Sequence, residues 1–153
     1  MRLAEALSRR SYVATRMAEL RKRANSNAQH QEGTDPIEDP HALLAEYEEL
    51  TAEFETLVRR INATNMTTEL SPGVTLTDAL AQRDSLRARH RMYTELADAA
   101  TAPARRYSRS EIRQLPSVDV RELRQKADDV ARQLRELDSR VQELNWATEV
   151  GEE

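Results

Sequence analysis

The chain has no cysteine, only three glycines, and aromatic residues at 4% of its 153 positions. Without cysteine it can form no disulfide, no catalytic thiolate and no zinc site built on cysteine. The three glycines are too few for a phosphate-binding loop of the P-loop or Rossmann type. These absences leave no cofactor to predict from the sequence, and no catalytic residue.

Long apolar runs are also missing from the sequence. No segment approaches the roughly 18 apolar residues of a membrane span, so we expect no transmembrane helix. The first helical segment contains several arginines and no apolar core of signal-peptide length, so a cytoplasmic location is expected. The net charge of −4 argues against a general nucleic-acid binder, because such proteins need an excess of positive charge.

What the chain does contain is charge and helix-forming residues. Charged residues make up 33% of the sequence, and alanine, leucine, glutamate and arginine dominate it. The mean hydropathy of −0.78 is low for a compact globule of this size. This composition predicts an all-α protein with long, exposed helices.

The sequence reads as an internal duplication. The segment 3–10 resembles 76–83 at an offset of 73 residues, and 65–70 resembles 145–150 at an offset of 80. The two offsets differ by seven residues, which is one heptad and would preserve the packing phase. We therefore predict two tandem antiparallel αα-hairpins that form an elongated, coiled-coil-like four-helix bundle. The bundle is expected to be a single domain over 1–153, with repeat 1 at about 1–70 and repeat 2 at about 74–150.

Local signals place the four helices. We expect helices from Arg2 to Ala24, from the Asp39-Pro40 cap to about Thr68, from the Thr75/Asp78 capping box, and after Asp119. Ser71-Pro72-Gly73 should end the second helix. Their apolar stripes are Leu3, Leu7, Val13, Met17, Leu20 and Ala24; Leu43, Tyr47, Leu50, Phe54, Leu57 and Ile61; Leu76, Leu80, Leu86, Tyr93, Ala97 and Ala100; and Leu123, Ala127, Val130, Leu134, Leu137, Val141 and Leu144.

Narrow stripes with this 4-3 spacing are typical of coiled-coil seams, and a seam can be completed by another chain. We therefore expect the protein to be a homo-oligomer, with itself as its main partner.

Repeated polar residues are expected to meet at one end of the bundle. With Asp138 added, they form a candidate polar cluster of Glu5, Arg10, Asn65, Glu69, Asp78, Arg83, Asp138, Asn145 and Glu149. Such a cluster could hold a divalent cation or an anion. The preferred interpretation is structural, because polar residues at helix ends usually cap them. Arg83 is expected to contact Asp138, which lies at the same level of the second hairpin.

The long connector of the second hairpin is a second candidate surface, made of Arg105, Arg106, Tyr107, Arg109 and Glu111. Basic residues around an aromatic ring could bind phosphate groups or RNA. We favour the alternative that these cations follow a helix C-terminus and face acidic neighbours, because the whole chain is acidic.

Several of these segments together resemble the small bacterial all-helical proteins labelled septicolysin. The resemblance is carried by Leu3-Ala4-Glu5-Ala6-Leu7, Gln31-Glu32-Gly33, Ile61-Asn62 with Thr64-Asn65, Leu76-Thr77-Asp78-Ala79-Leu80, Arg106-Tyr107-Ser108-Arg109-Ser110-Glu111-Ile112 and Asn145-Trp146. It implies an all-helical, multimeric bacterial protein, and the label implies a membrane-active cytolysin.

The leading functional hypothesis is a non-enzymatic, self-associating helical protein that acts as an assembly or binding scaffold. Two alternatives stay open. One is the cytolysin that the resemblance implies, and the other is a metal-dependent enzyme that uses the polar end of the bundle.

Overall fold

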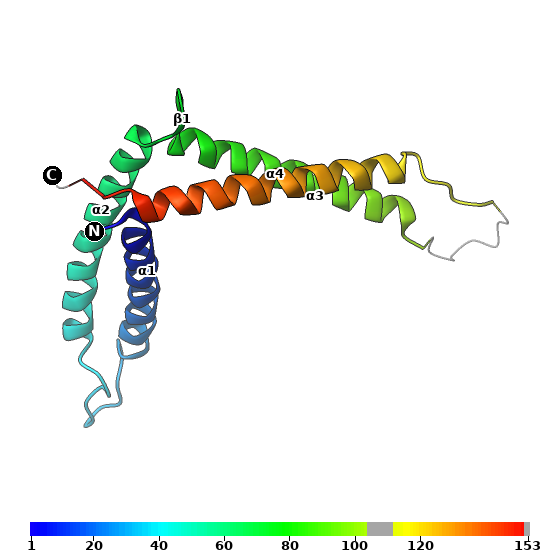
Figure 1. The fold of residues 1–153 in the computed structure, drawn as a ribbon. Helices are drawn as coiled ribbons and strands as arrows, with labels where there is room; N and C mark the ends of the chain where they lie inside the picture. The colour runs from blue at the N-terminus through cyan, green and yellow to red at the C-terminus, as the bar shows by residue number, and fades with distance from the viewer. Residues whose placement is uncertain (104–111, 152–153) are drawn as a thin grey trace. The chain divides into compact units, whose positions relative to one another are not determined.

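The computed structural model describes residues 1–103 and 112–151. Its elements in chain order are α1 (Leu3–Ser26), α2 (Pro40–Thr67), β1 (Glu69–Ser71), β2 (Val74–Thr75), α3 (Leu76–Thr101) and α4 (Val120–Ala147). The chain divides into two compact units, one made of residues 1–69 with the segment from 142 on, and one made of residues 70–141. Figure 1 shows α1 and α2 side by side, and α3 and α4 side by side. The predicted all-helical hairpin architecture is confirmed.

The first unit is built around the α1–α2 hairpin. Asp39 caps α2 by accepting a hydrogen bond from the His41 N–H at 2.9 Å, and Pro40 occupies the first helical position, as predicted. The connector is fastened by Asn27, whose side chain accepts from the Glu38 N–H at 3.0 Å and donates to the Arg23 carbonyl at 2.9 Å. These bonds explain why α1 runs to Ser26, two residues beyond the predicted end.

The seam of this hairpin follows the predicted stripes only in part. Buried on it are Leu3, Ala6, Val13 and Leu20 of α1, and Leu43, Leu57, Ile61 and Thr64 of α2. Met17, Tyr47 and Phe54 are half-buried, although they were expected on the seam with the others. A two-helix hairpin covers only one side of each helix, so large side chains at the edge of the seam keep part of their surface exposed.

A two-stranded antiparallel ribbon lies between α2 and α3 in the sequence. The sequence predicted a break at Ser71-Pro72-Gly73 but no strands, and in the structure β1 ends at Ser71 and β2 begins directly after Pro72-Gly73. Gly73 has φ +77°, in the left-handed region that glycine adopts without steric cost. β1 has three residues and β2 has two, so both strands are too short to give a periodic signal in the sequence.

The second unit holds the α3–α4 hairpin. Thr75 and Asp78 form the predicted capping box at the start of α3, and Asp119 Oδ1 accepts from the Glu122 N–H at 3.0 Å at the start of α4. Two ion pairs join the helices: Arg83 with Asp138, and Arg124 with Asp98. The later residue of α3, Asp98, pairs with the earlier residue of α4, Arg124, so the two helices are antiparallel. The buried apolar residues of this unit are Leu76, Ala79, Leu86, Ala97, Ala127, Val130, Leu137 and Val141.

The two ends of the chain pair with each other in the first unit, which the sequence did not predict. The Leu3 N–H donates to the Thr148 carbonyl and the Val150 N–H donates to the Met1 carbonyl, both at 2.9 Å. These bonds form an isolated antiparallel bridge between Arg2 and Glu149. Leu3 is 0% exposed and Val150 is 4% exposed, so the paired ends close the core at the start of α1.

The α3 cap gives a direct test of how the fold is held. Thr75→Ala removes the hydroxyl that accepts from the Asp78 N–H, and we expect the free energy of unfolding to fall by about 1 kcal/mol. Thr77→Ala, at an exposed position in the same turn, is the control and should cause no comparable loss. Urea unfolding followed by circular dichroism measures both, and equal losses in the two variants would contradict the capping role.

Candidate functional site

The predicted polar cluster divides between the two units. Six of its nine residues belong to the first unit and three to the second; the six are Glu5, Arg10, Asn65, Glu69, Asn145 and Glu149, and the three are Asp78, Arg83 and Asp138. Their convergence into one site stays a prediction. Within each unit, the hydrogen bonds of the individual side chains show what those side chains do.

Two carboxylates of the first unit serve the start of α1. Glu5 Oε2 accepts the Arg2 N–H at 2.8 Å, which satisfies one of the free backbone donors at the helix N-terminus. The Arg2 guanidinium donates to the Ala147 carbonyl at 2.9 Å and lies 3.6 Å from Glu149 Oε1. Arg2 was absent from the candidate site, yet it links both of these acids to the paired chain ends.

The remaining residues of this unit have different surroundings. Asn145 is 7% exposed and Asn65 is half-buried, whereas Glu69 is exposed at the start of β1. Arg10 is half-buried and forms no ion pair with any residue in the described part of the chain. An arginine on an apolar stripe can bury its stem against apolar neighbours while its charged end stays in water.

In the second unit, Asp78 is a capping residue. Its carboxylate accepts the Thr75 N–H at 2.9 Å and the Thr75 hydroxyl at 2.8 Å, and these hydrogen bonds lower the pKa of Asp78 below its ordinary value.

The predicted contact of Arg83 is present: Arg83 Nη1 lies 3.7 Å from Asp138 Oδ1. This separation fits an ion pair without a hydrogen bond. The buried Nε of Arg83 has no hydrogen-bond partner among the described residues. An unpaired buried donor carries a desolvation cost, so the pair adds little net stability.

The hairpin registers show that Arg10 and Arg83 are not equivalent in space. Arg9 pairs with Glu53, which places Arg10 level with about residue 52 of α2. Arg83 pairs with Asp138, whose counterpart at the offset of 80 is Val58. The two levels differ by about one heptad. The repeated segments therefore align the start of α1 with the start of α3. The register between α3 and α4, however, is shifted relative to the register between α1 and α2.

The strongest polar feature is one that sequence reasoning missed. A series of arginine–glutamate pairs, which we call the Arg–Glu ladder, runs along one side of the α1–α2 hairpin. Its three pairs are Arg9 with Glu53, Arg16 with Glu46, and Arg23 with Glu38. The arginines recur every seven residues, and this spacing was the signal in the sequence that could have revealed the ladder.

The ladder pairs have good geometry. Arg9 donates to Glu53 from two nitrogens, at 2.5 and 2.8 Å, and Arg23 likewise donates to both oxygens of Glu38. Such paired bonds fix the planes of both groups. They lower the pKa of the Glu53 and Glu38 carboxyls below their ordinary value of 4.5. The three pairs of the ladder therefore join α1 and α2 at matching levels along the hairpin.

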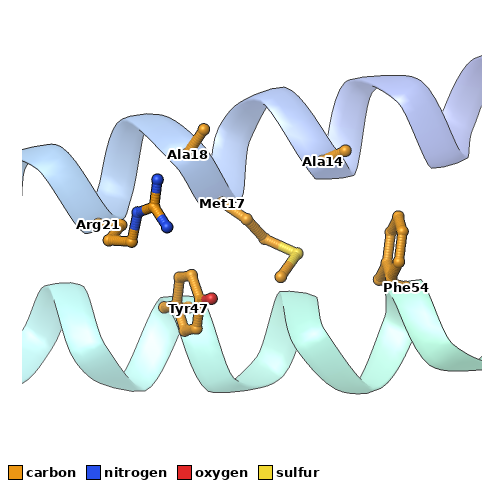
Figure 2. Close-up of a pocket in the computed structure, with 6 residues that line it drawn as sticks. All are labelled: Ala14, Met17, Ala18, Arg21, Tyr47 and Phe54. Atoms are coloured by element: carbon orange, nitrogen blue, oxygen red, sulfur yellow. The ribbon is translucent and has the colours of Figure 1, made fainter.

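The opposite side of the same hairpin is apolar and open. We call it the groove face; it is lined by Ala14, Met17, Ala18, Arg21, Leu44, Tyr47 and Phe54. Figure 2 shows Met17 reaching from α1 toward α2, between Tyr47 and Phe54. One hollow of about 210 Å³ lies here, and a second of about 220 Å³ shares Arg21 and Tyr47 with it. The two hollows therefore adjoin each other along the groove face.

Three further expectations concern the connector, a metal site and a membrane-spanning helix. The connector residues Arg105, Arg106, Tyr107, Arg109 and Glu111 lie outside the described residues. Over residues 1–103 and 112–151, no group of three or more histidine and acidic side chains is placed to hold one metal ion. In the same part of the chain, no helix combines the length and apolar character needed to cross a membrane.

The ladder predicts a specific pH dependence. Because the pKa values of the Glu38 and Glu53 carboxyls are lower in the folded state, the unfolded state binds protons more readily as pH falls below about 4.5. The ladder's contribution is therefore present at neutral pH and is lost as pH falls through the lowered folded pKa. We expect Glu38→Gln/Glu53→Gln to be less stable than the natural chain at neutral pH, with a difference that shrinks as pH falls below about 4.5.

Urea unfolding at each pH measures this difference. Glu49→Gln/Glu95→Gln is the matched control, because both glutamates are exposed and neither forms an ion pair with a described residue. A difference that stays constant as pH falls would contradict the role of the ladder.

The Arg83–Asp138 pair predicts a different result. We expect Arg83→Met to change the free energy of unfolding by less than about 1 kcal/mol, because the apolar side chain removes an unpaired buried donor. Leu86→Ala, at a 3% exposed position on the same helix, is the reference and should cost about 2–5 kcal/mol. A loss in Arg83→Met as large as in Leu86→Ala would show that the ion pair is essential to the hairpin.

Comparison with known proteins gives relatives without an assigned activity. One solved structure, described as a functionally unknown conserved protein from Corynebacterium diphtheriae, is 48% identical to this chain. It covers 99% of both chains with a TM-score of 0.94. A search of curated proteins finds no match. A family model, described as a family of unknown function (DUF6847), matches residues 10–150, and the chain therefore belongs to that family.

Proposed function

We propose that this protein is a non-enzymatic, self-associating helical protein that serves as a cytoplasmic assembly or binding scaffold. The observation that carries the proposal is the groove face, where Met17, Tyr47 and Phe54 stay half-buried beside the seam of the hairpin. Large apolar side chains that the hairpin itself leaves partly open are typical of a surface that another helix covers.

The energetics of the hairpin support the same interpretation. Each Å² of apolar surface removed from water contributes about 25 cal/mol, so covering the exposed parts of several large side chains stabilises an assembly by several kcal/mol. The Arg–Glu ladder already holds the register within one chain, so a partner can add to the groove face without rearranging the helices.

The resemblance to septicolysin-labelled proteins adds a finer prediction, activity on membranes. It rests on the sequence segments that carry the resemblance. The metal-dependent activity of the polar end likewise stays a prediction. The scaffold proposal is preferred because a described surface carries it.

The test of the proposal is the mass of the protein in solution. Sedimentation equilibrium from about 1 to about 200 µM covers the range in which micromolar association is detected. We expect a mass of at least twice the 17.5 kDa of the chain at the upper concentrations. A mass of one chain over the whole range would contradict the proposal.

A further inference from the structure

We propose that the groove face of the α1–α2 hairpin is covered by the groove face of a second copy, with α1 of each copy lying against α2 of the other. The inference rests on the proposed self-association, and it identifies the surface and the arrangement of the partner. A two-fold axis running along the hairpins produces this arrangement, which is that of an antiparallel four-helix bundle.

The shape of the groove suits a helix. The residues of α1 that line its first hollow are Ala14, Met17, Ala18 and Arg21, which follow the i, i+3, i+4, i+7 pattern of one helix face. Two of them are alanines, which allow a partner helix to approach closely. Across the groove, Leu44 of α2 is 49% exposed. A partner helix would cover Leu44 together with the half-buried rings of Tyr47 and Phe54.

The two helices carry opposite charges. Within α1, six arginines and lysines outnumber two glutamates, and within α2, five glutamates outnumber two arginines. Placing α1 of one copy against α2 of the other therefore brings a basic helix to an acidic one on both sides of the axis. Placing α1 against α1 would bring like charges together.

The charges along the rims of the groove have no ion-pair partner among the described residues. Arg10 and Arg21 share the face of Ala14 and Met17 by their helical spacing, and Glu48 and Glu55 follow Leu44 by four and eleven residues. None of these four side chains forms an ion pair with another described residue. One face thus presents both signs of charge around an apolar groove, which makes it complementary to itself. A partner helix of a single charge sign would match only one rim.

Charge reversal tests this pairing. An acidic copy, Arg10→Glu/Arg21→Glu, carries four acidic rim residues, and a basic copy, Glu48→Arg/Glu55→Arg, carries four basic ones. We expect each copy alone to associate at least about tenfold more weakly than the natural chain, because like charges then meet across the interface. We expect an equal mixture of the two to form a mixed dimer, because the rims are again complementary.

Neighbouring glutamates of α2 provide a matched control. Glu48→Arg changes the groove rim and should weaken association, whereas Glu49→Arg changes a residue three positions after the ladder residue Glu46 and should not. Helicity measured by circular dichroism shows whether each variant is folded, so a loss of association is not mistaken for unfolding.

Thiol labelling gives a second readout without charge changes. Because the chain has no cysteine, a single introduced cysteine reports one position. Ala18→Cys lies in the groove and should react slowly when the protein is concentrated and faster on dilution. Thr15→Cys is exposed and lies outside the residues that line the groove, and it should react at the same rate at both concentrations.

The outcomes separate the two proposals. If the natural chain has the mass of one copy at every concentration, the proposed function itself fails. If it associates, but both reversed copies keep the natural mass and the cysteine at position 18 reacts equally at both concentrations, self-association stands and the groove is not its surface. Weakened single copies, a restored mixture and protection of position 18 together support the two-fold pairing.

Discussion

Two helices that pair with each other can each bury only one side, and the structure of the first unit follows from this constraint. The α1–α2 seam buries Leu3, Val13, Leu20, Leu57 and Ile61. The flanks on both sides of the seam are not covered by this pairing. One flank is occupied by the Arg–Glu ladder, whose ion pairs join the two helices at matching levels. The other flank holds half-buried apolar side chains, together with charges that form no ion pair with another described residue. This difference between the flanks leads to the proposed self-association.

The ladder is also a feature in which the two repeats differ. At an offset of 73 residues the ladder arginines correspond to Gln82, Arg89 and Leu96, so the second hairpin cannot repeat the series. That hairpin instead has cross-helix pairs near its two ends, Arg83 with Asp138 and Asp98 with Arg124, and its helices are shifted by about one heptad. The duplication thus kept the hairpin architecture while the surface chemistry of the two copies diverged.

Sequence reasoning predicted the features that depend on local or periodic signals. Asp39 with Pro40, Thr75 with Asp78, and the break at Gly73 act within a few residues, and the apolar stripes repeat over many. The features it missed depend on residues far apart in the chain. Predicting the bridge between Arg2 and Glu149 requires knowing that the two chain ends meet. Predicting the ladder requires knowing which residues of α1 and α2 face each other, and no local signal gives that register. The half-buried state of Met17, Tyr47 and Phe54 has the same origin, since periodicity identifies a seam but not its edges.

The most direct test of the central claim is the exposure of the four methionine methyl groups in the natural chain. With carbon-13 methyl labelling, a soluble paramagnetic probe broadens the NMR signals of exposed methyls. The account predicts that Met17 is protected at high concentration and becomes accessible on dilution. Met66 and Met92, which are 67% and 56% exposed, serve as internal references and should stay accessible throughout. Equal accessibility of Met17 at both concentrations, in a sample whose mass shows association, would contradict the claim that the groove face is where two copies meet.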